Sequence, residues 1–139
     1  MKKIKISGSA YVAIIKHLTD GYPDEVCGIL LGKDESVEGI IPVNNIDTGK
    51  KKKIHFGIDP LELYEAELKA ADANLEVMGF VHSHPDRPAI LSGEDERFMI
   101  PGMLYVIVSA TKESHSDPRG FIKPVEEEKY REVIISVEE

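Results

Sequence analysis

The segment MLYVIVSA, from Met103 to Ala110, is apolar throughout and is the feature that most constrains the fold of this chain. A strand with one wet face alternates apolar and polar residues, so a continuous apolar run predicts a central strand covered on both faces. Strand and helix patterns also interleave along the sequence. We therefore expect an α/β or α+β fold, in which helices pack on a sheet.

Further strand patterns lie on both sides of this run. VCGILLG, from Val26 to Gly32, and VEGIIPV, from Val37 to Val43, indicate the two strands of a hairpin, because the short polar segment KDES joins them. VMGFVH, from Val77 to His82, predicts another strand. Two short candidates, at 121–123 and 132–137, close the chain.

Three helices are expected between the strands. Ser9 can cap a helix that runs to about Asp20, Asp59 and Pro60 mark the start of a second, and SGEDERFMI (92–100) predicts a short third. Apolar residues recur at steps of three and four in the first two. This spacing predicts that each of these helices buries the face carrying them: Tyr11, Ile14, Ile15 and Leu18 in the first, and Leu61, Tyr64, Leu68, Ala71 and Leu75 in the second.

Composition limits the functions that this chain can have. Its 139 residues, without repeats or linkers, predict one domain spanning 1–139. The formal net charge of −8 argues against a nucleic-acid partner, which requires a basic face. The single cysteine, Cys27, excludes an internal disulfide and fits a reducing compartment. Neither a signal peptide nor a membrane span is recognisable, so we expect a cytoplasmic protein without a membrane partner.

The stretch GFVHSHPDRPAILSGEDERF (79–98) gathers two histidines, a serine and an aspartate. Side chains two apart on a strand point the same way, so His82 and His84 can reach one ion from the strand end. Asp95 lies in the first turn of the next helix and can supply a third ligand. Two imidazoles and a carboxylate suit zinc, with the fourth position open to water as in catalytic sites.

This stretch also has plainer interpretations. Histidine pairs at strand ends are common, and Ser92 with Asp95 forms a capping box in which Asp replaces Glu. A zinc-bound water also needs a base, which HSHP does not contain. The candidate is Glu25, just before an apolar strand, although a glutamate there is ordinarily a solvated turn residue. Cys27 and His17 are expected to be a packed core residue and a solvated residue, respectively.

Together these residues resemble the signature of the JAMM (MPN+) metalloprotease family. That signature is a distant glutamate, then H-x-H-P, six residues, a serine, two residues and an aspartate. Here Glu25 precedes HSHP, residues 86–91 supply the six, and residues 93 and 94 separate Ser92 from Asp95. PDEVCG, FGIDP and PGMLYVIVSA look like the short prokaryotic branch of this family, so the resemblance covers most of the chain.

The resemblance implies a cytidine-deaminase-like JAB/MPN fold, a mixed twisted sheet flanked by helices. It implies one zinc ion per chain held by His82, His84 and Asp95, with water as the fourth ligand. Glu25 would be the general base, and Ser92 would donate a hydrogen bond to the oxyanion of the tetrahedral intermediate. The implied reaction is hydrolysis of the peptide or isopeptide bond after the C-terminal Gly-Gly of a ubiquitin-like or sulfur-carrier protein, by a protein that can form a homodimer.

Two other functions remain open at this point. Some relatives with degraded motifs are non-catalytic binding or scaffold modules, although all five site residues are present here. A metal hydrolase with a different substrate class, or an accessory protein of a desulfurisation pathway, is the other alternative. Metal content and turnover separate these functions.

Overall fold

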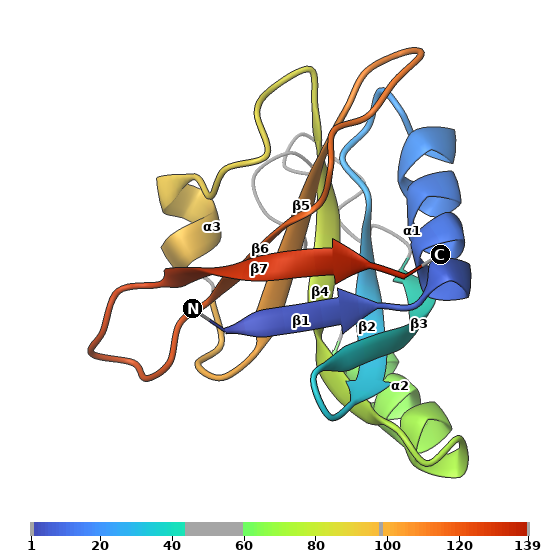
Figure 1. Cartoon of the computed structure of the whole chain (residues 1–139), viewed down its shortest axis with the longest axis vertical. Coiled ribbons are helices and arrows are strands. Elements are labelled where there is room, and N and C mark those ends of the chain that lie inside the picture. The colour runs from blue at the N-terminus through green and yellow to red at the C-terminus, as the bar shows by residue number, and fades with distance from the viewer. Residues whose placement is uncertain (1, 44–59, 98, 139) are drawn as a thin grey trace.

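The computed structural model describes residues 2–43, 60–97 and 99–138. Helices are interspersed with strands along the first two thirds of the chain, and strands complete it (Figure 1). The elements, in chain order, are β1 (Lys3–Ile6), α1 (Gly8–Asp20), β2 (Cys27–Lys33), β3 (Ser36–Val43), α2 (Pro60–Asp72), β4 (Glu76–Pro85), α3 (Gly93–Arg97), β5 (Leu104–Ala110), β6 (Arg119–Ile122) and β7 (Arg131–Val137).

The strands form one mixed sheet in the order β1-β3-β2-β4-β5-β6-β7, and β1 also pairs with β7, so the sheet closes into a barrel. The pairs β1–β3, β1–β7 and β4–β5 are parallel, and the others are antiparallel. The predicted mixed sheet with helices is confirmed, including the β2–β3 hairpin. Neither the closure nor β1 was predicted, although Ile4 and Ile6 on β1 are buried.

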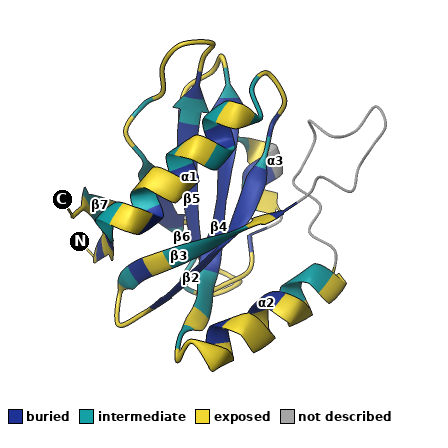
Figure 2. Cartoon of the chain, turned by 90° about the vertical axis from the view of Figure 1, so that its right-hand side faces the viewer, coloured by how far each residue is buried: buried dark blue, intermediate teal, exposed yellow. Residues whose placement is uncertain are grey.

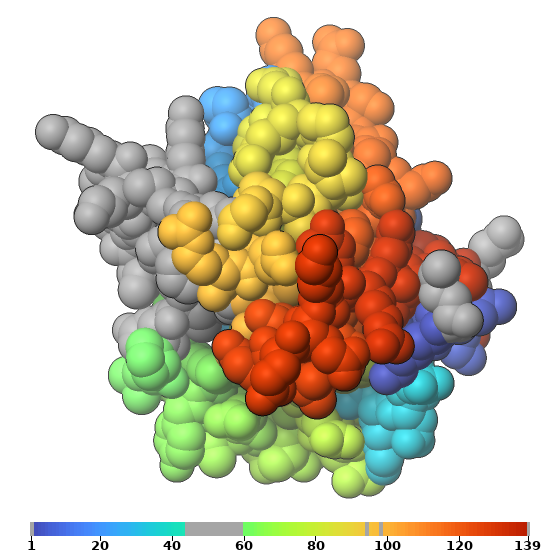
Figure 3. Space-filling view, turned by 90° about the vertical axis from the view of Figure 1, so that its left-hand side faces the viewer, coloured from blue at the N-terminus to red at the C-terminus, as the bar shows by residue number. Residues whose placement is uncertain are grey.

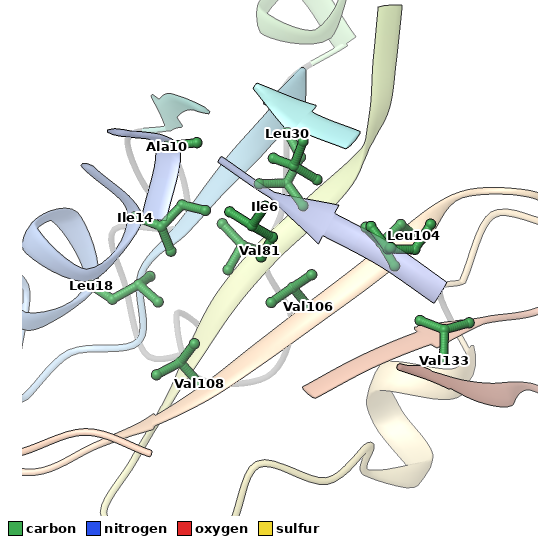
Figure 4. Packing of buried hydrophobic residues seen from close by; sticks show 12 residues of the cluster. Ile6, Ala10, Ile14, Leu18, Leu30, Val81, Leu104, Val106, Val108 and Val133 are labelled. Carbon is green, nitrogen blue, oxygen red and sulfur yellow. The ribbon is translucent and has the colours of Figure 1, made fainter. Parts of the chain in front are cut away.

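Two hydrophobic clusters cover the two faces of the central strands. One contains Val106 and Val108 of β5 with Ile14 and Leu18 of α1, and Figure 4 shows these side chains pointing toward one another. The other contains Tyr105 and Ile107 of the same strand. Strand β5 is therefore covered on both faces, as its apolar run predicts, and Figure 2 shows the buried central strands between the helices.

Helix α1 buries Ile14 and Leu18 as predicted, with Tyr11 and Ile15 partly buried beside them. Its cap is Ser7 instead of Ser9, since the Ser7 hydroxyl oxygen accepts a hydrogen bond from the Ala10 N–H. Among the described residues, no helix is both long enough and apolar enough to span a membrane.

Helix α2 corrects the prediction about its buried face. Leu61, Tyr64 and Leu68 are exposed by 60%, 57% and 51%, and the buried positions are Ala66 and Ala70. Ala71 is also exposed, and Leu75 is partly buried but lies beyond the helix end. Small alanines let the helix backbone approach β2 and β4 closely, whereas the larger stripe points away from the sheet. The proposed cap Asp59 lies outside the described residues.

Candidate metal centre and active site

His82 and His84 lie on β4, which ends at Pro85, three residues beyond the predicted strand. Alternation along β4 places both imidazoles on the same face as Phe80, and places Val81 in the cluster of the opposite face. Both histidines are buried, with 0% and 1% exposure. Buried imidazoles at a strand end require polar partners, and the third residue of the predicted site supplies one.

Asp95 on α3 faces both histidines. The His84 Nε2 is 3.1 Å from one Asp95 carboxylate oxygen, and the His82 Nε2 is 3.5 Å from the other. Figure 3 shows the segment from the end of β4 to α3, coloured yellow to gold, on one face of the molecule between α2 below and the 111–118 segment above. The folded segment thus brings a carboxylate from eleven residues further along the chain back to the histidine pair.

The geometry of the three side chains fits one zinc ion. Ligand atoms about 2 Å from a tetrahedral zinc ion are about 3.3 Å apart. The two histidine Nε2 atoms are 3.2 Å apart, and one ligand atom from each of His82, His84 and Asp95 lies within 4.8 Å of the others. The set of two nitrogens and one oxygen is compatible with zinc and leaves one tetrahedral position for another ligand.

The hydrogen bonding of His84 supports the same conclusion. Its Nδ1 lies 2.8 Å from the Pro88 carbonyl oxygen, which can only accept, so Nδ1 carries the proton. The Nε2 atom faces the acceptor oxygens of Asp95, and unless it carries a proton it presents a lone pair to them. Two acceptors at this distance require a proton or a cation between them. The donor set is therefore one that a metal ion would satisfy.

Ser92 and Asp95 form the capping box that the sequence predicts. The Asp95 N–H donates to the Ser92 hydroxyl oxygen at 2.9 Å, and the Ser92 N–H donates to an Asp95 carboxylate oxygen at 3.0 Å. The cap interpretation and the metal interpretation are therefore compatible, because the cap orients the carboxylate toward the histidines. The Ser92 hydroxyl acts as the acceptor in this cap, which leaves its proton for another acceptor.

Glu25 lies beside this centre although it is far upstream of the histidines in the sequence. Cys27 pairs with His82 in the antiparallel β2–β4 ladder, and the Ser83 N–H donates to the Val26 carbonyl oxygen at 2.9 Å. If the Cys27–His82 pairing is extended by two residues toward the start of β2, Glu25 lies opposite His84. Glu25 is 7% exposed, so it is not the solvated turn residue that its sequence position would ordinarily suggest.

Opposing effects set the acidities of the two carboxyl groups. Burial raises the pKa of Glu25, and the charges of His82, Arg87 and His84 lower it by less, so the net pKa lies above the usual value. Burial also acts to raise the pKa of Asp95. Hydrogen bonds with His82 and His84 outweigh that effect, and the pKa of Asp95 lies well below its usual value. Glu25, whose pKa is raised, thus lies beside Asp95, whose lowered pKa keeps its carboxyl group ionised.

The structure tests two further expectations. Cys27 is a buried core residue, as predicted, and burial raises the pKa of its thiol to about 12. His17 is not solvated as expected, because it is partly buried and its Nε2 lies 2.7 Å from the Cys27 carbonyl oxygen. Sequence reasoning missed Arg87, whose guanidinium bonds to Glu25, and nothing in the pattern around it signals that long-range contact.

Comparisons with known proteins agree with this fold and site. A family model described as prokaryotic homologs of the JAB domain matches residues 8–119. The chain is 30% identical over 114 residues to the desampylase of Haloferax volcanii, an alignment that covers 77% of this chain and 81% of that protein.

Solved structures agree as well. A protein from Desulfitobacterium hafniense has a solution structure that matches with a TM-score of 0.82 at 28% identity, covering 98% of this chain and 93% of that one. A solved structure described as a JAMM metalloprotease-like zinc site in the proteasome and signalosome matches with a TM-score of 0.61 at 22% identity. The match covers 99% of this chain and 100% of that one. At that identity, the second likeness concerns the fold alone.

A mixed sheet with flanking helices and a His-His-Asp centre defines a hydrolytic enzyme of the JAMM metallopeptidase class. Within that class, the chain belongs to the prokaryotic family of JAB-domain homologues.

Proposed function

We propose that this enzyme hydrolyses the peptide or isopeptide bond that follows the C-terminal Gly-Gly of a ubiquitin-like or sulfur-carrier protein. The observation that carries the proposal is that His82, His84 and Asp95 converge on one point. The buried carboxylate of Glu25, which lies far upstream in the sequence, is beside them. Similarity to a desampylase supports an enzyme that acts on ubiquitin-like conjugates.

His82, His84 and Asp95 would hold one zinc ion, for which their donor atoms and spacing are suitable. When bound, this ion supplies Lewis-acid activation of water and of the scissile carbonyl. The protein residues supply the proton transfers. Glu25 accepts a proton from the attacking water and passes it to the leaving amine, and its raised pKa suits both steps.

Ser92 completes the proposed machinery. Its hydroxyl oxygen caps α3, and its proton is available to the oxyanion that develops on the substrate carbonyl. Both histidines are buried, so the reacting carbonyl must approach a recessed site. Glycine has no side chain and lets a substrate backbone come this close, which fits a diglycine tail.

We further propose that residues 1–139 act as one catalytic domain in the cytoplasm. The single cysteine of the chain fits that reducing compartment. The resemblance to the JAMM family also allows a homodimer, whose formation light scattering would measure.

The decisive experiment uses a panel of ubiquitin-like and sulfur-carrier proteins, each extended by a short peptide beyond its Gly-Gly. The zinc-loaded protein should cut at least one of them after the second glycine, as mass spectrometry of the products would show. A chelator should abolish the cut, and added zinc should restore it.

Asp95→Ala should lower the zinc content from about one ion per chain to a trace, whereas Asp117→Ala at an exposed loop position should not. A zinc-loaded protein that binds these substrates without cutting any of them would instead indicate a non-catalytic binding module.

A further inference from the structure

Two segments that are distant in sequence meet beside Glu25. Residues 22–25 precede β2, and residues 85–87 follow the histidines of β4. Pro23, Pro85, Asp86 and Arg87, together with Glu25, line a pocket of about 320 Å³. The side chains that join the two segments across this pocket belong to neither the proposed metal ligands nor the proposed oxyanion donor.

Arg87 makes the contact closest to the proposed chemistry. Its Nη2 donates to Glu25 Oε2 at 2.6 Å, a short distance for a charge-assisted hydrogen bond. The Arg87 side chain is 43% exposed and that of Glu25 is 5% exposed. The arginine thus reaches inward from solvent to hold one oxygen of a buried carboxylate, and a buried carboxylate needs such a partner to stay ionised.

A second contact anchors the loop that carries Arg87. The Tyr22 hydroxyl donates to Asp86, with its oxygen 2.9 and 2.8 Å from the two carboxylate oxygens. Asp86 adopts a left-handed backbone conformation, with φ of 57°, which aspartate tolerates better than most residues. The chain therefore turns sharply directly after β4. The turn and the Tyr22 bond together place the Arg87 side chain over Glu25.

We infer that Arg87 is the positioning residue of the general base, fixing one oxygen of the Glu25 carboxylate so that proton transfer occurs from a single orientation. This inference rests on the proposed function, because it assigns Arg87 a role through Glu25. The positive charge of Arg87 is paired with Glu25 of the same chain, so Arg87 needs no anionic group of the substrate as a partner. Arg87 therefore acts on turnover and not on substrate affinity.

The first test compares Arg87→Gln and Arg87→Lys with a control variant, Arg131→Gln. Arg131 lies at the start of β7 and forms an exposed ion pair with Glu128, which the control breaks. With zinc bound, Arg87→Gln should lower kcat by about 10- to 100-fold and leave KM within about twofold, because a misplaced catalytic group lowers the rate without weakening binding. Arg87→Lys should restore part of kcat, since it keeps the charge, and Arg131→Gln should match the wild type. An unchanged kcat in Arg87→Gln would overturn the inference.

The second test removes catalysis from the measurement. In a Glu25→Gln background, the dissociation constant of an uncut substrate, measured by calorimetry, should stay the same after Arg87→Gln. Weaker binding in the double variant would show that Arg87 contacts the substrate, and would overturn the positioning role. Zinc content should equal that of the wild type in every variant, since Arg87 is not a proposed ligand.

The third test uses the metal-free protein and needs no substrate. Arg87→Gln leaves the buried Glu25 carboxylate without its cation and should lower the melting temperature by about 3 °C. The double variant Glu25→Gln/Arg87→Gln should melt above Arg87→Gln alone, and additive effects of the two changes would contradict the inferred contact. If the wild type cuts no substrate, the proposed function fails, and this thermal cycle alone then decides whether Arg87 holds Glu25.

Discussion

Ser83 and Val26 exchange two hydrogen bonds across the end of the β2–β4 ladder. The Ser83 N–H donates to the Val26 carbonyl oxygen at 2.9 Å, and the Val26 N–H donates to the Ser83 hydroxyl oxygen at 3.0 Å. Ser83 lies between the two histidines, and Val26 follows Glu25. The pair therefore ties the proposed base to the strand that carries two proposed metal ligands.

Replacing Ser83 tests this connection. Ser83→Ala removes the acceptor of the Val26 N–H and should destabilise the fold by about 1–2 kcal/mol in chemical denaturation. It should also lower turnover by about tenfold, because the segment carrying Glu25 loosens. Ser7→Ala removes an equivalent acceptor, that of the Ala10 N–H, at the start of α1 and outside the site. This control should cost similar stability without changing turnover, and equal turnover in both variants would argue against the connection.

The proposed base can be tested without disturbing the metal. Glu25→Gln should retain about one zinc ion per chain and lower kcat by about 10²- to 10⁴-fold, the usual contribution of a general base. The control variant is Glu132→Gln. It breaks the ion pair, at 2.8 Å, between Glu132 on β7 and Arg119 on β6, and should retain full activity. Metal analysis and steady-state kinetics give both quantities. Wild-type activity in the Glu25→Gln variant would require another base.

Ser92 has two separable contributions. Ser92→Ala should cost about 1 kcal/mol of stability through loss of the α3 cap, and about 10²-fold in kcat through loss of the oxyanion donor. Ser7→Ala removes the cap of α1 instead and should lose similar stability while keeping its activity. Denaturation and kinetic measurements on the two variants separate the effects. If both variants lost stability and neither lost activity, Ser92 would be a cap alone.

Asp95 should make the stability of the metal-free protein depend on pH. Its pKa is lower in the folded protein than in the unfolded chain, so the ionised form stabilises the fold above the unfolded value of about 3.9, and this contribution is lost as the pH falls. Wild type should exceed Asp95→Asn by about 1–2 kcal/mol at pH 7, and the gap should close between about pH 5 and pH 2. Asp20→Asn, at an exposed position, should show a smaller gap. Denaturation in the presence of a chelator measures both differences.

Gly79 tests the sheet beneath the site. A Cβ atom at this position would collide with the backbone of Leu104, its partner on β5, and neither backbone can move without breaking the ladder that carries the histidines. Gly79→Ala should therefore destabilise the protein by about 3 kcal/mol or prevent its folding. Gly39→Ala on β3 meets no neighbouring atom and should change stability by less than about 1 kcal/mol. Comparable thermal melting of the two variants would contradict this packing.

The sequence by itself determined the type of each strand and helix except β1, because hydrophobic periodicity acts over a few neighbouring residues. The apolar run of β5 predicted its two covered faces, and the spacing of His82, His84, Ser92 and Asp95 predicted which side chains would meet. Those four residues lie within one strand, a loop and a helix turn, so their placement depends on local geometry.

Only the tertiary structure decided the remaining features. Two of these features join segments that are far apart in sequence: the closure of β1 onto β7, and the contact of Arg87 with Glu25. The third is the rotation of α2 that buries Ala66 and Ala70, which depends on how the helix packs. Helical periodicity identified an apolar stripe on α2, but close approach to the sheet favours the face with the smaller side chains. Such contacts depend on which surfaces fit together, and a linear pattern does not encode that choice.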